Sequence, residues 1–157
     1  FEEADIIIIS IRYFPYLNKT KLKNDIKDLK KLIFFLKKNN KKILLINNGP
    51  VFETNSFPLK TIILRNKNKT LSEKDLKTKL YSLIYKEVFY VNQLLLENFN
   101  NQIKIFNKFK LVCSFDNNTC SYKDKNGNII FFDKDHIHTE AAKNIKIPNF
   151  IKIINNL

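Results

Sequence analysis

The stretch ADIIIISI, Ala4 to Ile11, indicates the fold of this chain. Its β-branched residues run on without the polar alternation of a half-solvated strand, which is typical of a strand buried on both faces of a sheet. A second buried strand is expected from Lys42 to Asn47, and the turn residues Asn48, Gly49 and Pro50 end it. Two such strands in sequence predict a sheet that helices cover on both sides.

Two segments have the three- and four-residue spacing of amphipathic helices. The first runs from Lys21 to Asn39, with Lys and Asp on the side opposite the apolar stripe. The second runs from Thr70 to about Phe99, and Thr70 with Glu73 is expected to form a capping box at its start. The apolar stripe of the first helix comprises Leu22, Ile26, Leu29, Leu32, Ile33 and Leu36.

The remaining segments predict further strands and one last helix. Short strands are expected at Lys60–Leu64, Ile103–Phe106 and Lys110–Cys113, a hairpin or arm at Tyr122–Phe132 that turns at Gly127, and a helix from Ile137 or Thr139. Strands that alternate with helices predict an α/β fold, a three-layer α/β/α sandwich around a mostly parallel sheet. Chemistry in such sheets gathers at the carboxyl ends of the strands, here the loops after Ile11, Asn47 and Cys113.

Length and composition predict one domain with a real core. The chain has 157 residues, 44% of them hydrophobic, and no apolar run reaches the roughly 18 residues of a membrane helix. It contains no Met, so we expect that Phe1 is not a translation start, and no signal peptide can be recognised before the first strand. We expect a fragment of a longer protein rather than a mature chain.

The net charge of +13 does not by itself indicate a nucleic-acid partner. Only Arg12 and Arg65 among the 28 basic residues are arginines, whereas readers of bases and phosphates favour the bidentate guanidinium. The lysines spread along every segment, which favours a solvated surface of compositional origin. A weak attraction to anionic polysaccharide or lipid head groups stays open.

Cys113 and Cys120 enclose the polar hexapeptide SFDNNT, which has the composition of a turn. Their spacing differs from that of zinc sites and CxxC redox motifs. A local disulfide, which would place the domain outside the cytoplasm, and two reduced thiols in the core are both compatible with the spacing.

The stretch FFDKDHIHTEAA, Phe131 to Ala142, carries the candidate chemistry. Asp133 precedes His136 by three residues, and Asp135 precedes His138 by the same interval. A carboxylate that accepts from one imidazole nitrogen leaves the other nitrogen available as a base. The pair therefore predicts half of a charge-relay site, with surface ion pairing as one alternative. A metal site made by Asp133, His136 and His138 is the other.

Two positions at strand ends are candidate donors. Arg12 follows the first strand and could bind an anionic group, or form a structural ion pair. Asn48 follows the second strand and could present an amide to an oxyanion, or simply belong to a turn.

The order of these features resembles the SGNH (GDSL-like) hydrolase domain, with its flavodoxin-like sheet, in the version fused to bacterial multi-pass membrane O-acyltransferases. The resemblance rests on S-x-R-(aromatic) after the first strand, on N-G-P-V-F, on the two Cys and on the closing block. The family block reads approximately Asp-x-x-His-Leu-Ser-x-x-Gly-Ala. It aligns Asp133 and His136 with the family acid and base, while His138 replaces Ser and Ala141 replaces Gly.

The resemblance implies a Ser-His-Asp mechanism that moves an acyl group, most simply acetyl, on or off a sugar hydroxyl, without metal or organic cofactor. The family's nucleophile block, Gly-Asp-Ser, is absent and is expected upstream of Phe1, so residues 1–157 would form one SGNH-like domain without its first strand. The chain alone is then expected to be inactive. Ser10 lies at a strand end but lacks the Gly-rich elbow that a nucleophile needs.

The implied partners are an acyl donor, a cell-surface glycan and a fused membrane acyltransferase domain, with no nucleic acid. The implied location is the periplasmic side of an inner membrane. Two other functions stay open: a non-catalytic α/β module that binds glycan or polyanions through its lysines, and a degenerate SGNH domain that only holds glycan for its membrane partner.

Overall fold

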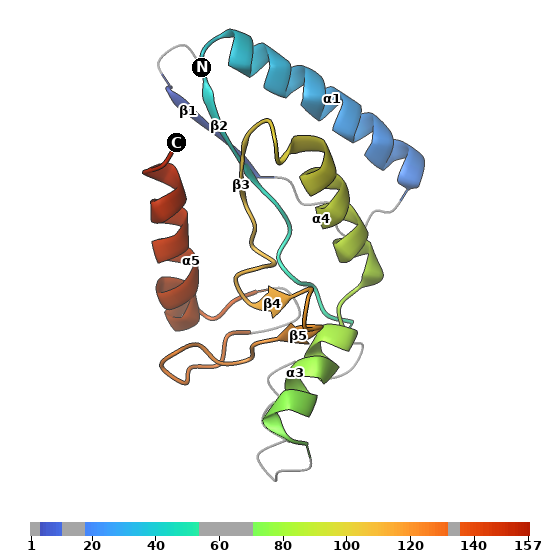
Figure 1. Ribbon diagram of the computed structural model, residues 1–157, viewed down its shortest axis with the longest axis vertical. Helices are drawn as coiled ribbons and strands as arrows, with labels where there is room; N and C mark the ends of the chain where they lie inside the picture. The colour runs from blue at the N-terminus through green and yellow to red at the C-terminus, as the bar shows by residue number, and fades with distance from the viewer. Residues whose placement is uncertain (1–3, 11–17, 54–70, 132–135) are drawn as a thin grey trace.

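The computed structural model describes residues 4–10, 18–53, 71–131 and 136–157 (Figure 1). Three parallel strands form its main sheet: β1 (Ile6–Ser10), β2 (Lys42–Ile46) and β3 (Lys104–Phe106), in the order β1-β2-β3. The central strand pairs with a neighbour on each side. The expected parallel sheet and the burial of β2 are therefore confirmed, whereas the expected burial of β1 on both faces is wrong, because β1 lies at one side of the sheet and its Ile8 is 47% exposed.

Helices cover the two faces of this sheet (Figure 1). On one face, α1 (Lys19–Lys38) and α4 (Lys86–Phe99) pack together, while α5 (Thr139–Ile154) lies on the opposite face. This arrangement is the expected three-layer α/β sandwich. Among the described residues, no helix is both long enough and apolar enough to cross a membrane.

Successive side chains of a strand point to opposite faces of the sheet, so apolar residues are buried on each face. Ile43 and Leu45 of β2 join the apolar stripes of α1 and α4, whereas Leu44 points to the other side and is fully buried. On that other side, the ring of Phe106 packs edge-on against Phe150 of α5 at 5.3 Å. Burial of both faces explains why the central strand β2 is a nearly continuous apolar run.

A second core lies beyond the carboxyl ends of the strands. It is formed by α3 (Glu73–Ser82), the two-stranded sheet of β4 (Cys113–Ser114) and β5 (Thr119–Cys120), and the hairpin that turns at Gly127. Gly127 has a φ of +82°, a conformation that side chains resist, so the expected Gly turn is confirmed. The start of the last helix at Thr139 is confirmed as well.

The predicted single helix from Thr70 to Phe99 is wrong, because the structure has two helices, α3 and α4, over this range. The chain leaves the helical path at Leu83–Tyr85, where the backbone after β2 pairs with it. Glu53 donates its N–H to the carbonyl of Leu83 at 2.6 Å, and Tyr85 donates to the carbonyl of Val51 at 3.0 Å. A tertiary contact therefore interrupts an apolar pattern that continues through the break.

Two smaller expectations are also corrected. The cap of α3 is Ser72, whose hydroxyl accepts from the N–H of Asp75 at 3.1 Å, and not Thr70. The predicted strand at Lys110–Cys113 is a turn up to Val112, because Cys113 donates its N–H to the carbonyl of Phe109. The predicted strand at residues 60–64 lies outside the described residues.

Candidate functional site

The carboxyl ends of β2 and β3 are locked together by a buried amide. Asn47 follows β2 and is completely buried. Its Nδ2 donates to Oδ1 of Asn107 at 3.0 Å, and its Oδ1 accepts the N–H of Lys108 at 2.8 Å. Since both ends of the amide are used, Asn47 is a structural residue of this edge.

Asn48, the candidate donor, is held by a second buried amide. Asn92 of α4 is fully buried, and its Oδ1 accepts the N–H of Asn48 at 3.1 Å while its Nδ2 donates to the carbonyl of Asn48 at 3.0 Å. The backbone N–H of Asn48 is thus already used and is unavailable to an oxyanion. Both of these hydrogen bonds use the backbone of Asn48, and the residue itself is only 5% exposed.

The loop that carries His136 is tied to the same edge through aromatic packing. Phe131 begins this loop, is buried, and forms an isolated antiparallel bridge with Ile137 just after His136. The ring of Phe131 packs edge-on against Phe52 at 4.8 Å, and Phe52 follows Asn48 by four residues. The two ends of the histidine loop therefore close on the segment that leaves β2.

The two histidines differ in their local setting. His138 is the N-cap residue of α5, and its N–H donates to the carbonyl of Ile130 at 2.7 Å. His136 immediately precedes Ile137, which pairs with Phe131, and the side chain of His136 is exposed. Asp133, Asp135 and Arg12 lie outside the described residues. The alternative metal site includes Asp133 and so lies outside them as well.

A buried carboxylate fixes both flanks of the histidine loop. Asp124 in the preceding hairpin accepts from the side chain of Asn144 on α5 at 2.8 Å. It also accepts the N–H groups of Asn126 and Asn128 and the side-chain amide of Asn128. These hydrogen bonds, above all that from Asn144, lower the pKa of Asp124 to about 2.

We expect Asp124→Asn to remove an acid-dependent part of the stability. A carboxyl group whose pKa is about 2 when folded and near 4 when unfolded stabilises the fold above pH 4, and this contribution is lost as the pH falls from 4 to 2. Urea unfolding of the wild-type chain should therefore show a fall in stability across that window, and the variant a smaller fall from a lower starting value.

The matched control for this prediction is Asp116→Asn, in the exposed turn between β4 and β5. That variant should keep the wild-type pH dependence between 4 and 2. An unchanged pH dependence in Asp124→Asn would contradict the assignment of the acid-dependent step to this carboxylate.

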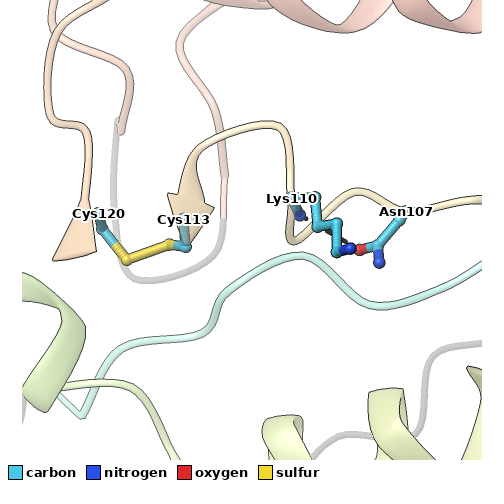
Figure 2. The surroundings of a disulfide bond; sticks show 4 residues. All are labelled: Asn107, Lys110, Cys113 and Cys120. Carbon is cyan, nitrogen blue, oxygen red and sulfur yellow. Dashed lines mark hydrogen bonds between the residues drawn. A yellow bond between two sulfur atoms is a disulfide. The ribbon is translucent and has the colours of Figure 1, made fainter. Parts of the chain in front are cut away.

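A disulfide closes the small sheet of the second core (Figure 2). Cys113 and Cys120 are bonded, pair across β4 and β5, and are both buried against the second core. The disulfide alternative is therefore confirmed over two reduced thiols. Figure 2 also shows Asn107, which accepts the N–H of Lys110 at 3.2 Å, so the turn between β3 and β4 is tied back to the strand edge.

Sequence reasoning missed Asn92 and Asp124. Asn92 lies on the apolar stripe of α4, four residues after Val88 and one after Val91, and a polar residue in a buried stripe indicates a specific hydrogen bond. Asp124 begins the run Asp-Lys-Asn-Gly-Asn, whose side chains favour local turn hydrogen bonds. Neither signal reveals the distant partner, which tertiary structure alone supplies.

The sheet order, the covering helices and the histidine loop packed beside the end of β2 define a hydrolase-like α/β domain. A model of the SGNH domain (fused to AT3 domains) matches residues 2–147. The chain belongs to this family.

The structure is similar to the periplasmic domain of the lipopolysaccharide acetyltransferase of Salmonella ser. Paratyphi A, with a TM-score of 0.67 and 17% sequence identity. The match covers 97% of this chain and 56% of that chain, so this chain spans little more than half of its length. At this identity the similarity establishes the fold. No curated protein matches the sequence.

Proposed function

We propose that this chain is the catalytic SGNH-type part of a membrane O-acyltransferase that transfers an acyl group, most simply acetyl, to a hydroxyl of a cell-surface polysaccharide. Membership in the SGNH family fused to AT3 domains supports an acyl-transfer role. The similar fold of a lipopolysaccharide acetyltransferase periplasmic domain supports a glycan as acceptor. The disulfide supports an oxidising compartment such as the periplasm.

One observation carries the proposal: the packing of Phe131 against Phe52. It brings the loop that contains His136 to the segment that follows Asn48, at the edge of the sheet where α/β proteins do their chemistry. This packing supports the proposal that His136 as the base and Asn48 as an amide donor act at one edge.

The proposed mechanism uses a serine that the family resemblance places before Phe1. His136 takes the proton of this serine as its oxygen attacks the acyl carbonyl, and gives that proton to the departing donor group. His136 next deprotonates the sugar hydroxyl, whose oxygen attacks the acyl-enzyme, and then returns this proton to the serine oxygen as the ester bond to the serine breaks. Asp133 would hold His136 in the productive tautomer and stabilise its cation.

The oxyanion of each tetrahedral intermediate needs hydrogen-bond donors. We propose the side-chain amide of Asn48 as one of these donors, since the backbone of Asn48 is held by Asn92. Arg12, which follows β1 in the sequence, is proposed as a second contact to the anionic intermediate or to the substrate.

We expect Asn48→Ala to lower kcat for acetyl transfer about 100-fold in the intact protein, which is typical for loss of one oxyanion donor. The substitution should leave the backbone in place, because both hydrogen bonds to Asn92 use the backbone of residue 48. The measurement is the appearance of O-acetyl groups on purified polysaccharide, followed by proton NMR.

The control for Asn48 is Asn117→Ala, in the exposed turn between β4 and β5, which should transfer acetyl at the wild-type rate. Equal rates for Asn48→Ala and Asn117→Ala would remove Asn48 from the site. Polysaccharide binding by the wild-type protein without any acetyl transfer would contradict the proposed enzyme and favour the glycan-binding module.

A further inference from the structure

The outward side of α1 carries two adjacent exposed aromatic residues. Phe34 is 72% exposed and Phe35 is 60% exposed, whereas Leu29, Ile33 and Leu36 on the inward side of the same helix are buried. One apolar stripe of α1 therefore packs in the core, while Phe34 and Phe35 form a second apolar area that faces solvent. Adjacent exposed rings of this size are typical of an interaction surface.

Lysines surround Phe34 on the helix surface. Residues three and four positions away are its neighbours on a helix, and all four of these are exposed lysines: Lys30, Lys31, Lys37 and Lys38. The acidic residues of α1 lie nearer its start, where Asp28 pairs with Lys31 at 2.8 Å. We name Phe34, Phe35, Lys30, Lys37 and Lys38 the basic-aromatic surface.

This surface continues into a hollow beyond the end of α1. The hollow has a volume of about 380 Å³ and is lined by Lys37, Lys41, Lys42 and Lys104, together with the amides of residues 100–102. No Asp or Glu is among the described residues that line it. Nζ of Lys37 donates to the carbonyl of Gln102 at 3.2 Å, which fixes one lysine between the helix and the hollow.

We propose that the basic-aromatic surface binds an anionic phospholipid bilayer, with Phe34 and Phe35 in the interfacial region and the lysines on head-group phosphates. Aromatic rings beside lysines on one side of a helix are the composition of interfacial helices. The positive charges around the two rings are complementary to the phosphates of an anionic bilayer. The hollow adds further lysines beside this surface.

The proposed orientation has a geometric consequence for the candidate site. The hollow lies at the amino ends of β2 and β3, at the same end of the molecule as the end of α1 (Figure 1). Asn48 and the histidine loop lie past the carboxyl ends. The length of β2 separates the two edges by roughly 15 Å, so docking would hold the candidate site away from the lipid and toward the glycan.

Insertion can be measured directly because the chain contains no Trp. Phe34→Trp makes the reporter, and Ile147→Trp, at a position on α5 that is 50% exposed, is the matched control. With vesicles of phosphatidylglycerol and phosphatidylcholine, the indole emission of F34W should shift to shorter wavelength and be quenched by brominated acyl chains, while that of I147W should do neither. Absence of both effects in F34W, or equal effects in the two variants, would overturn the proposal.

The charge contribution is tested with two triple variants of equal net charge. Lys30→Gln, Lys37→Gln and Lys38→Gln together should weaken binding to phosphatidylglycerol vesicles about 100-fold, from roughly a factor of five for each lysine near the membrane. Lys74→Gln, Lys79→Gln and Lys125→Gln, exposed on α3 and the hairpin, form the control triple and should weaken binding less than about fivefold. Equal losses in the two triples would show general adsorption of a basic protein and overturn the assigned surface.

These measurements are independent of acyl transfer. Loss of vesicle binding with normal transfer, or the reverse, distinguishes a failure of the membrane surface from a failure of the proposed function.

Discussion

Replacing His136 by Ala in the intact protein is expected to lower acyl transfer by roughly four to six orders of magnitude, because no other group would take the proton of the nucleophile. The fold should remain intact, since His136 is exposed and the backbone frame beside it is formed by Phe131, Ile137 and His138. The measurement is the rate of O-acetylation of polysaccharide, with circular dichroism and thermal unfolding as the check on structure.

The chain supplies its own controls for this experiment. His138→Ala stands two residues away, at the N-cap of α5, where the backbone of His138 donates to Ile130 and accepts from Ala142 while its side chain makes no capping hydrogen bond. It should retain most of the activity. Asp133→Asn is expected to cost about 10⁴-fold, as in other triads, and Asp135→Asn much less. Activity that survives in His136→Ala but is lost in His138→Ala would shift the assignment to the Asp135/His138 register.

Replacing Asn92 by Leu is expected to lower the free energy of unfolding by about 4 kcal/mol. Both the N–H and the carbonyl of Asn48 depend on this one side chain, and each buried backbone group left without a partner costs about 1–3 kcal/mol. Leu has a similar volume, so the loss is one of hydrogen bonds and not of packing. Urea unfolding followed by circular dichroism gives the change in free energy.

The control for Asn92 is Asn98→Leu on the same helix. The Asn98 side chain donates to the carbonyl of Leu94, within α4, so its loss should change stability by less than about 1 kcal/mol. If the two variants lost equal stability, Asn92 would be an ordinary polar residue and not the residue that holds the end of β2. Asn92→Leu should also reduce acetyl transfer in the intact protein, because the segment that carries Asn48 loses its anchor.

Much of the architecture could be predicted because it depends on local pattern. The uninterrupted apolar run at β2 is buried on both faces, and the stripe of α1 has one inward side. The positions of Gly127, Thr139 and the Cys pair likewise follow from local chemistry. Each of these features needs only neighbours in sequence to be recognised.

The errors arose where a distant segment decides the local structure. The apolar pattern runs through Leu83–Tyr85 as if one helix continued, but Val51 and Glu53 take its hydrogen bonds. In the same way, the Asn47-Asn48 pair is a turn by composition, and only the packing of α4 and β3 shows that Asn47 is held through its side chain and Asn48 through its backbone. A sequence pattern indicates the secondary structure that a segment favours, but it does not identify the distant residues that will form hydrogen bonds with it.

The sequence by itself determined that this chain forms an α/β sheet and that an acid stands three residues before an imidazole near its end, since periodicity and residue order are local properties. Tertiary structure decided which polar groups meet: that Asn92 holds Asn48, that Asp124 joins the hairpin to α5, and that Phe131 brings the histidine loop to the end of β2. Those contacts join residues between 20 and 79 positions apart. Only the closed core makes them neighbours, because burial, and not sequence order, selects which groups must pair.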